Sequence, residues 1–429
     1  MYSTGHAITP PATPAVRLNA VERIALAIMA FSLAALNGVP SILSCGVPCM
    51  AATLLLLLNY IRINGVSFAL PKSSGPILAV WALWVFLAIL SAVANFELVT
   101  ITTAFWSYVL PLAMLVVVLT TRPSIDDLKF VLAVLIAGWL LRFGYGALVF
   151  QQTLGFNSLE QVLAAHFYLD GFRPYATATY GSTGRTLALI VPAMICVALA
   201  FFFVKVRPAF KVLIVAALLI IAANALITGS RALFLVVSAV LLVSGLKSSM
   251  RGGVVIVALV GGVAALFFSS LDLETQNRFA NLFSTNRYLD NSVRERWESI
   301  DEGVEIMMSH VLGIGPGRSS EVLFHSVSHQ FAVFQGSEMG VLGLITVVVL
   351  YILTGWKFLT TSVATAAGLV FVFWASAFGW FSLAMLANSP VGSGPNMPWV
   401  GLFAFLWALG EVAPRGVEPR KLAPQAPGH

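Results

Sequence analysis

Long apolar stretches, separated by short breaks that contain charges, glycine or proline, dominate the chain. Such stretches predict membrane-spanning helices, because each can cross the hydrocarbon and pair its own backbone groups there. The stretches do not alternate between polar and apolar positions, which favours helices over membrane strands. The predicted spans are 24–40, 44–61, 75–94, 100–121, 130–150, 186–204, 212–228, 232–246, 253–270, 338–356, 364–386 and 398–412.

The spans predict an all-α polytopic membrane protein with about twelve transmembrane helices. A cytoplasmic tail (1–23) precedes spans one to nine (24–270, with an outward loop at 151–184), a large helical outward loop (271–337), spans ten to twelve (338–412) and a second tail (413–429). Asn37–Pro40 separates the first two spans, which could instead form one broken helix.

Composition supports a membrane protein and excludes a soluble globular domain. The chain is 59% hydrophobic and 10% charged, and its mean hydropathy is +0.91. A net charge of +6 could indicate nucleic-acid binding in a soluble protein, but here the basic residues lie in small groups between spans. We therefore expect no nucleic-acid partner. The three cysteines, Cys45, Cys49 and Cys196, fall in or beside apolar spans and are interpreted as packing residues.

The basic residues predict how the chain is oriented. With both termini in the cytoplasm, 15 of the 24 Lys and Arg residues, including every lysine, lie on the cytoplasmic side. The others are Arg142, Arg173, Arg185, Arg231, Arg278, Arg287, Arg294, Arg296 and Arg318. A guanidinium binds phosphate through two parallel hydrogen bonds, so a set made only of arginines suggests a phosphate or diphosphate ligand. Salt bridges and lipid headgroup contacts are the alternative.

The large outward loop contains a predicted amphipathic helix. Ser292 and Glu295 have the spacing of a capping box, and the apolar positions that follow recur with a helical period. We expect a helix from about Val293 to His310, ended by the glycine string Gly313–Gly317. This string lacks the lysine and the strand-loop-helix context of a nucleotide-binding loop.

Histidines outside the two tails all fall in the predicted outward loops: His166, His310, His325 and His329. His325 and His329 are four residues apart and could share a helix face as metal ligands, but no third ligand has the spacing of a known zinc motif. We expect no metal. A neutral imidazole is also the usual general base near neutral pH, and His329 lies just before the chain returns to the membrane.

Several motifs together resemble the O-antigen ligase and polymerase superfamily. His329–Gln330, followed after nine residues by Gly340 and Gly343, is similar to the signature of that family. Thr228–Arg231 resembles its Ser-Arg step, and Ser292–Arg296 with the following helix resembles the stretch before its histidine. The likeness covers roughly residues 225–345.

The resemblance implies a membrane glycosyltransferase that acts on the periplasmic face of a bacterial inner membrane. Its donor would be an undecaprenyl-diphosphate-linked glycan, and its acceptor a glycan or lipid A-core hydroxyl, without metal or other cofactor. The resemblance assigns His329 as the general base and Arg231 and Arg296 as diphosphate ligands. Arg294 competes with Arg296 for this role, and Arg185 is a further candidate.

Two alternatives remain open at the level of the sequence. A secondary transporter or flippase of lipid-linked sugars also fits twelve spans, although ionisable residues are scarce within the spans. Within the transferases, a ligase and a polymerase differ only in the acceptor, and a protein hydroxyl is a third possibility. The short tail after the last span favours the polysaccharide enzymes.

Overall fold

A computed structural model describes residues 18–35, 42–66, 70–154, 231–248, 291–319, 331–362, 368–386 and 397–412. These parts of the chain are helical and contain no strand. The α-helices are α1 (Ala20–Ala35), α2 (Ile42–Asn64), α3 (Gly75–Ala94), α4 (Leu98–Ala104), α5 (Leu110–Thr120), α6 (Ile125–Leu154), α11 (Arg231–Ser248), α14 (Asn291–Ser309), α16 (Phe331–Thr360), α17 (Leu369–Leu386) and α18 (Met397–Val412). The 3-10 helix η1 (Lys72–Ser74) precedes α3, and the π-helical segment η2 (Phe105–Val109) joins α4 to α5.

Polar pairs at the helix starts explain why α1 and α6 begin earlier than their apolar stretches. The Asn19 N–H donates to the Glu22 carboxylate, and the Glu22 N–H donates to the Asn19 side chain, both over 3.0 Å. Ser124 and Asp127 form the same reciprocal arrangement before α6. These capping pairs satisfy amides that have no partner within the helix. The helices α1 and α6 therefore begin about one turn before the predicted spans, which start at residues 24 and 130.

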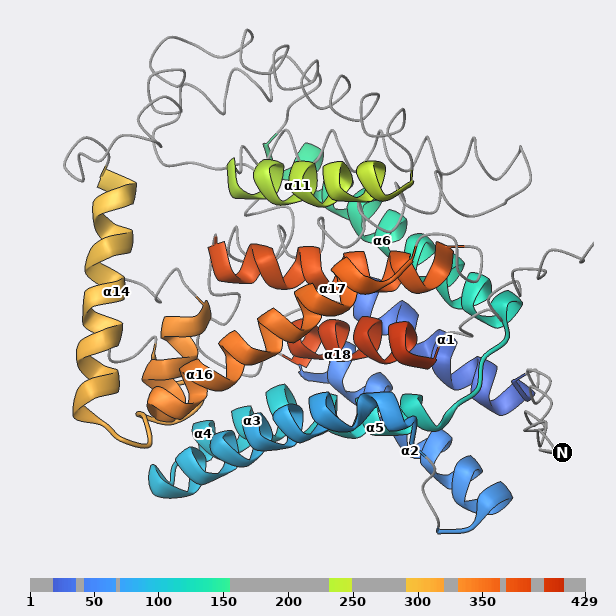
Figure 1. The fold of residues 1–429 in the computed structure, drawn as a ribbon, viewed down its shortest axis with the longest axis horizontal. Helices are drawn as coiled ribbons and strands as arrows, with labels where there is room; N and C mark the ends of the chain where they lie inside the picture. Colours follow the sequence, from blue (N-terminus) through green and yellow to red (C-terminus); the bar gives the residue numbers. More distant parts are fainter. Residues whose placement is uncertain are drawn as a thin grey trace, which may run out of the picture.

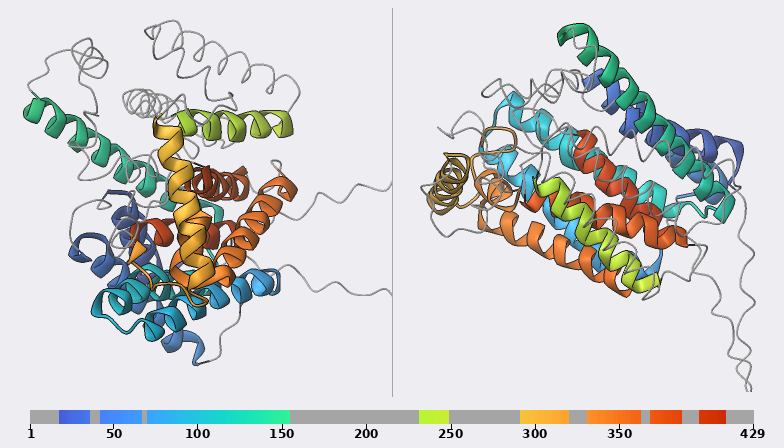
Figure 2. Two further views of the ribbon diagram at one scale, coloured as in Figure 1. Left: turned by 90° about the vertical axis from the view of Figure 1, so that its left-hand side faces the viewer. Right: turned by 90° about the horizontal axis from the view of Figure 1, so that it is seen from above.

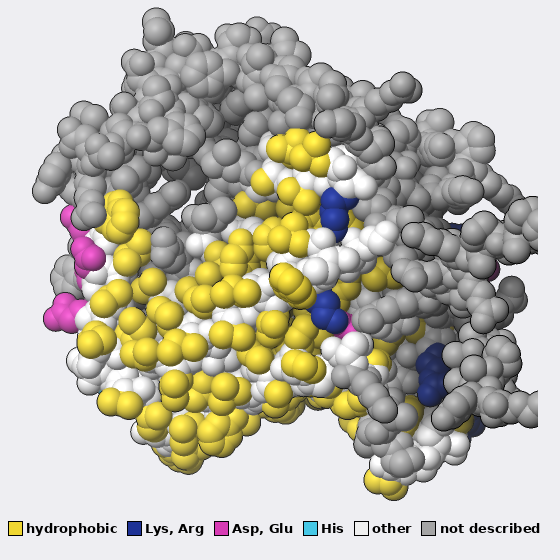
Figure 3. Space-filling view, in the orientation of Figure 1, with side chains coloured by type: hydrophobic (Ala, Val, Ile, Leu, Met, Phe, Trp, Pro, Cys, Tyr) yellow, Lys and Arg dark blue, Asp and Glu magenta, His cyan; other side chains and the backbone are white. Residues whose placement is uncertain are grey.

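Four helical runs are long and apolar enough to cross a membrane: Cys45–Asn64, Gly75–Ala94, Leu98–Thr120 and Phe331–Thr360. Shorter apolar helices lie at Ser238–Lys247, Leu369–Met385 and Val400–Val412. In the space-filling view, hydrophobic side chains cover most of the described face (Figure 3). The chain is thus a multi-pass membrane protein with apolar helices, and the count of twelve spans stays a prediction. The first two spans are two helices, α1 and α2, within the described ranges.

The helices of the bundle run roughly alongside one another, whereas α14 crosses one end of the bundle (Figure 1). Seen from above, α14 appears nearly end-on beside helices that are seen along their length (Figure 2, right). Contacts join α14 to α16, α16 to α3 and α17, and α17 to α18. The predicted amphipathic helix of the outward loop is confirmed as a helix at Asn291–Ser309.

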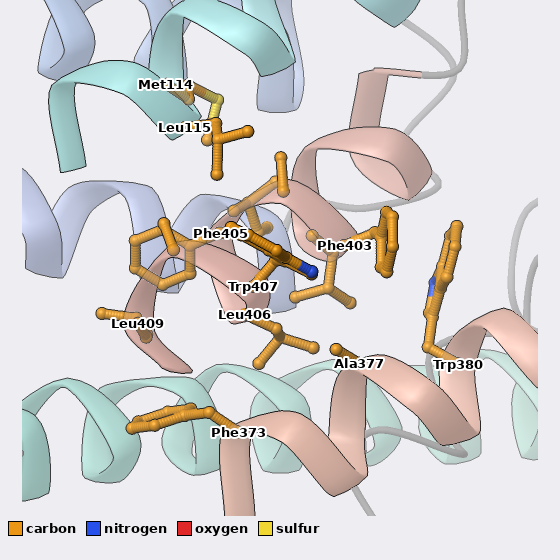
Figure 4. Packing of buried hydrophobic residues seen from close by; sticks show 14 of the residues in the cluster. Met114, Leu115, Phe373, Ala377, Trp380, Phe403, Phe405, Leu406, Trp407 and Leu409 are labelled. Atoms are coloured by element: carbon orange, nitrogen blue, oxygen red, sulfur yellow. The ribbon is translucent and has the colours of Figure 1, made fainter. Parts of the chain in front are cut away.

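Large buried side chains, many of them aromatic, fill the centre between α5, α17 and α18 (Figure 4). The Trp380 and Phe403 rings stack with centroids 5.0 Å apart, and the Trp81 ring of α3 also stacks on Phe403, with centroids 5.4 Å apart. Trp374 and Trp407 meet edge to face at 4.9 Å. In lipid, helices associate largely through such close packing, because water does not drive apolar surfaces together there. This packing therefore fixes the helices that support the loop after α14.

The helix ends at the opposite side of the bundle from α14 carry paired charges. Lys357 of α16 forms an ion pair with the buried Glu411 of α18, which also accepts a hydrogen bond from Ser73 at 2.9 Å. The Lys247 ammonium of α11 donates to the carbonyls of Phe358, Leu359 and Thr361 at 2.6 to 3.0 Å. We call Lys247, Lys357 and Glu411 the lysine end. These contacts join helix ends that the predicted topology places on one side of the membrane.

Candidate functional site

A buried carboxylate lies where α16 meets the loop that follows α14. Glu338 has no exposed surface, although it belongs to an apolar helix. Its Oε1 accepts hydrogen bonds from the Gly317 N–H at 2.6 Å and from the Ser319 hydroxyl at 3.2 Å. The Tyr108 hydroxyl lies 3.4 Å from Oε2, where it can donate. A carboxylate is costly to bury without such donors, so the loop and the acid stabilise each other.

Gln335, one turn before Glu338, extends the polar cluster into the bundle. Its Oε1 accepts from the Trp84 indole N–H at 2.9 Å, and its amide nitrogen donates to the Tyr108 hydroxyl at 3.0 Å. Trp84 and Tyr108 come from α3 and from η2, and all these side chains are buried. Buried polar groups of this kind rigidify a structure when each has a partner. The cluster therefore fixes the start of α16 against α3 and η2.

The helix α16 is broken at Gly340, and the loop after α14 binds to α16 at this break. Gly340 has φ 74° and ψ −177°, far from helical values, so the carbonyls just before it are not all used within the helix. The Ser337 carbonyl accepts from the Ile314 N–H at 3.0 Å, and the Glu338 carbonyl accepts from the Gly315 N–H at 3.1 Å. The loop thus pairs with backbone groups that the break leaves available.

The loop and α16 approach each other so closely that only glycine fits at position 313 of the loop and at position 340 of α16. A Cβ on Gly313 would occupy the position of the Glu338 carbonyl group, and a Cβ on Gly340 would collide with the Val311 carbonyl oxygen. Both residues also have positive φ, which side-chain-bearing residues rarely adopt. We call Gly313, Gly315, Gly317, Glu338 and Gly340 the glycine junction.

The same loop also contacts the turn between α3 and α4. The Asn95 amide donates to the Gly313 carbonyl at 3.1 Å, and the Arg318 guanidinium forms an ion pair with Glu97 at 3.0 Å. Arg318 is one of the nine arginines that the sequence places outside the cytoplasm, and the structure gives it a partner on α4's N-terminal side. It therefore serves to hold the loop on the bundle.

Some of the predicted site residues lie on described helices, and the others lie outside the described residues. Arg231 is the first residue of α11, and Arg294 and Arg296 lie in the first two turns of α14; the structure describes their backbone and not their side chains. Arg185 and His329 lie outside the described residues, as do His166 and His325. The predicted catalytic side chains are therefore not brought together by any described contact.

Two helices differ in their bounds from the predicted elements. The helix α16 begins at Phe331, before the predicted start of the tenth span at residue 338, and its first part is already buried. The helix α14 begins at Asn291, so Ser292 lies inside it and is not the residue that caps it. It also ends at Ser309, with His310 and two further residues before Gly313 turns the chain. The glycine string therefore follows the helix end and docks on α16.

Sequence reasoning missed the buried polar cluster. Gln335 and Glu338 are three residues apart in an otherwise apolar segment, which places both on one helix face. A polar pair of this kind inside a predicted span is expensive and indicates a buried partner. Residue 335 falls in the predicted outward loop (271–337), so the pattern of spans separates it from Glu338. Glu338 is one of the few ionisable residues within the predicted spans, and it is fully buried.

In the part of the chain that the structure describes, no three His, Cys, Asp or Glu side chains lie close enough together to hold a metal ion. His310 is exposed there, and its Nδ1 lies 3.0 Å from the Ser309 hydroxyl and 3.2 Å from the Ile306 carbonyl oxygen. The pair His325 and His329 lies outside these residues. His310 is therefore tied to the end of its own helix.

Comparison with known proteins agrees with the resemblance seen in the motifs. A search of curated proteins finds no match for this chain. A protein-family model described as O-antigen ligase matches residues 216–332. The matched range includes Arg231, Arg294, Arg296 and His329, and it ends just after α16 begins. The chain is therefore similar to the O-antigen ligase family over residues 216–332, which is less than half of its length.

Proposed function

We propose that this protein transfers a glycan from an undecaprenyl-diphosphate-linked donor to an acceptor hydroxyl on the periplasmic face of the bacterial inner membrane. The observation that carries the proposal is the O-antigen ligase family match, because it contains the histidine and three of the four arginines that the motifs single out. Arg185 lies before the match and rests on its predicted place at a span boundary alone.

The proposed reaction needs one base and a cationic site. The acceptor oxygen attacks the anomeric carbon, the bond from that carbon to the diphosphate oxygen breaks, and the lipid diphosphate leaves with the electron pair. His329 takes the proton from the acceptor hydroxyl. Arg231, with Arg296 or Arg294, neutralises the departing diphosphate, as a metal ion does in many other phosphate-releasing enzymes. No cofactor takes part in this scheme.

The location of α14 supports this arrangement. The helix crosses the end of the bundle (Figure 1), and its exposed residues include the acids Asp301 and Glu305. Its arginines lie at the end farther from the glycine junction, near the first residues of the helix. A lipid-linked donor would keep its prenyl chain in the membrane and present its diphosphate at this level.

The test uses a strain that lacks its own copy of the gene. We expect His329→Ala and Arg231→Ala each to abolish long-chain surface glycan at normal protein levels, while Arg318→Gln retains it. A matched in vitro assay with the lipid-linked donor should continue after exhaustive chelation of metal ions. Normal glycan in both of the first two variants would refute the assignment.

The acceptor can be identified from the same assay. Glycan joined to lipid A-core would indicate a ligase, growing chains on the lipid carrier a polymerase, and glycan on protein a third class. The transporter alternative predicts movement of the donor across the bilayer with no new glycosidic bond. The three buried acids of the described helices, Asp127, Glu338 and Glu411, have structural partners and do not favour transport.

A further inference from the structure

We propose that Glu338 is a positioning residue that locks the loop after α14 onto α16 and thereby sets the place of the arginines on α14. The proposal deepens the proposed function and rests on it for the role of those arginines. The locking itself rests on described contacts alone. Glu338 does not contact substrate in this scheme and acts through the loop.

The contacts of Glu338 join elements that are distant in sequence. Its carboxylate holds Gly317 and Ser319 of the loop, and its backbone carbonyl accepts from Gly315 and from the Ser91 hydroxyl of α3, the latter at 2.7 Å. One residue of α16 therefore binds the loop through three donors and α3 through a fourth. A substitution of the side chain removes the bonds to Gly317 and Ser319 and leaves the two bonds of the backbone carbonyl in place.

Burial of the acid makes the docking cooperative. When the loop is in place, its N–H and hydroxyl groups replace the water that a carboxylate requires. If the loop moved away, Glu338 would lose these donors inside an apolar bundle. An intermediate position is therefore unfavourable, and the loop is either docked or released.

The fit of the backbone fixes the register of the docked loop. Gly313 and Gly340 allow the loop and α16 to approach so closely that no side chain fits between them. The Met307 sulfur of α14 lies against Gly336 of α16, where a Cβ would approach it to 2.6 Å. The last turn of α14 is thus held by its own contact with α16 as well as by the loop.

A helix held at one end amplifies small movements at the other. From Ser309 back to Arg296 is 13 helical residues, or about 20 Å at the usual rise per residue. A tilt of roughly 10° at the junction would move the arginine by about 3 Å, which is enough to break a two-point contact with diphosphate. Precise docking by Glu338 is therefore needed for a diphosphate site on α14.

The first test measures docking without any assay of activity. Spin labels are placed by Met308→Cys on α14 and Leu83→Cys on α3, both exposed, after Cys45, Cys49 and Cys196 have been replaced by alanine. We expect a narrow distance distribution in the otherwise unchanged protein and in Glu338→Gln, whose side-chain oxygen can still accept from Gly317. Glu338→Ala should broaden it clearly.

Two further variants keep this test decisive. Ser319→Ala removes one donor and should broaden the distribution less than Glu338→Ala does, so it serves if that variant does not fold. Thr354→Val is the matched control, because Thr354 is buried in the same helix and its hydroxyl bonds to Leu350 of that helix. A distribution in Glu338→Ala or Ser319→Ala as narrow as in the control would overturn the proposal.

The second test connects docking to transfer. Glu338→Ala should lower kcat/KM for the lipid-linked donor by about tenfold or more, mainly through a higher KM, because misplaced arginines weaken donor binding. Glu338→Gln should restore most of this loss, whereas His329→Ala should reduce kcat. Unchanged KM together with broadened distances would overturn the link to the arginines. Normal activity in His329→Ala and Arg231→Ala would instead refute the proposed function, leaving the docking result intact.

Discussion

The lysine end and the glycine junction handle buried acids in opposite ways. At the lysine end, Glu411 is neutralised by the Lys357 ammonium, and the Lys247 ammonium binds the last carbonyls of α16. At the glycine junction, the described partners of Glu338 are a backbone N–H and hydroxyl groups. One end is held by charge pairs on flexible side chains, and the other by closely fitted backbone.

The difference shows what each end can tolerate. Lysine side chains are long and can adjust to small shifts of a helix or reach toward water. The backbone contacts of the glycine junction allow no such adjustment, because Gly313 and Gly340 leave no space. A rigid end suits a site that must hold reacting groups in place, so we expect the largest effects of substitution there.

Gly340→Ala should cause the largest loss of stability. The added Cβ would collide with the Val311 carbonyl oxygen at a positive φ of 74°, and the neighbouring contacts cannot move apart without releasing the loop. Strain and collision together should cost about 3 kcal/mol or more. The midpoint of thermal denaturation of the purified protein in detergent measures this cost.

Substitutions at two other glycines distinguish the cost of a positive φ from the cost of a collision with neighbouring atoms. Gly65 has a positive φ of 71° but no atom within 4 Å of an added Cβ, so Gly65→Ala should cost only about 1 kcal/mol. Gly75 begins α3 and has neither feature, so Gly75→Ala should change stability by less than about 0.5 kcal/mol. Equal effects at all three positions would show that the junction is not tightly packed.

Lys357→Met should have the next largest effect. It leaves the Glu411 carboxylate, which has no exposed surface on its side chain, without its cation, at a cost of about 3 kcal/mol. Lys357→Met combined with Glu411→Gln should recover most of that loss, because no buried charge remains. Denaturation midpoints of the single and double variants measure the coupling, and purely additive losses would contradict it.

The fold of the bundle could largely be predicted from the sequence, because apolar length is a strong signal in lipid. Gly75–Ala94 matches its predicted span 75–94 to the residue, and α14 was expected within two residues of each end. Helix starts were less certain because polar pairs such as Ser124 and Asp127 extend a helix beyond its apolar stretch. Hydropathy does not detect such pairs.

The glycine junction could not be predicted from the sequence, although its parts were visible. The glycine string was interpreted as a helix stop, and the docking partner Glu338 lies more than twenty residues later. Which acid a loop binds depends on how α16 breaks at Gly340, and this break arises from tertiary contacts. The catalytic roles of His329, Arg231, Arg296, Arg294 and Arg185 rest on motifs and stay predictions.

Acid should weaken a third contact, at the start of α6. Although burial alone would raise the pKa of Asp127, hydrogen bonds from Ser124, from the Leu18 N–H and from Arg23 lower that pKa below its ordinary value. The stabilisation is therefore fully present above the unfolded pKa of about 3.9 and is lost as pH falls through the lower, folded value.

Comparison with Asp127→Asn tests this pH dependence. The variant should be less stable than the parent protein by about 1 to 2 kcal/mol between pH 6 and pH 8. The difference should shrink only below about pH 4, where the unfolded state binds a proton that the folded state, with its lower pKa, does not yet bind. A difference that already disappears between pH 6 and pH 5 would contradict the direction of the shift.

The smallest effect is expected for Arg318→Gln, although Arg318 belongs to the loop of the glycine junction. Its ion pair with Glu97 is partly exposed, with 29% and 47% of the two side chains accessible, so solvent screens it and its loss should cost at most about 0.5 kcal/mol. Glycan transfer should stay near normal, whereas Arg296→Gln should reduce it strongly if Arg296 binds diphosphate. Arg296 lies near the start of α14, and Arg318 lies in the loop that follows this helix. Equal losses of transfer in both variants would show that the two arginines act only through their positive charge. That result would exclude a specific diphosphate site on α14.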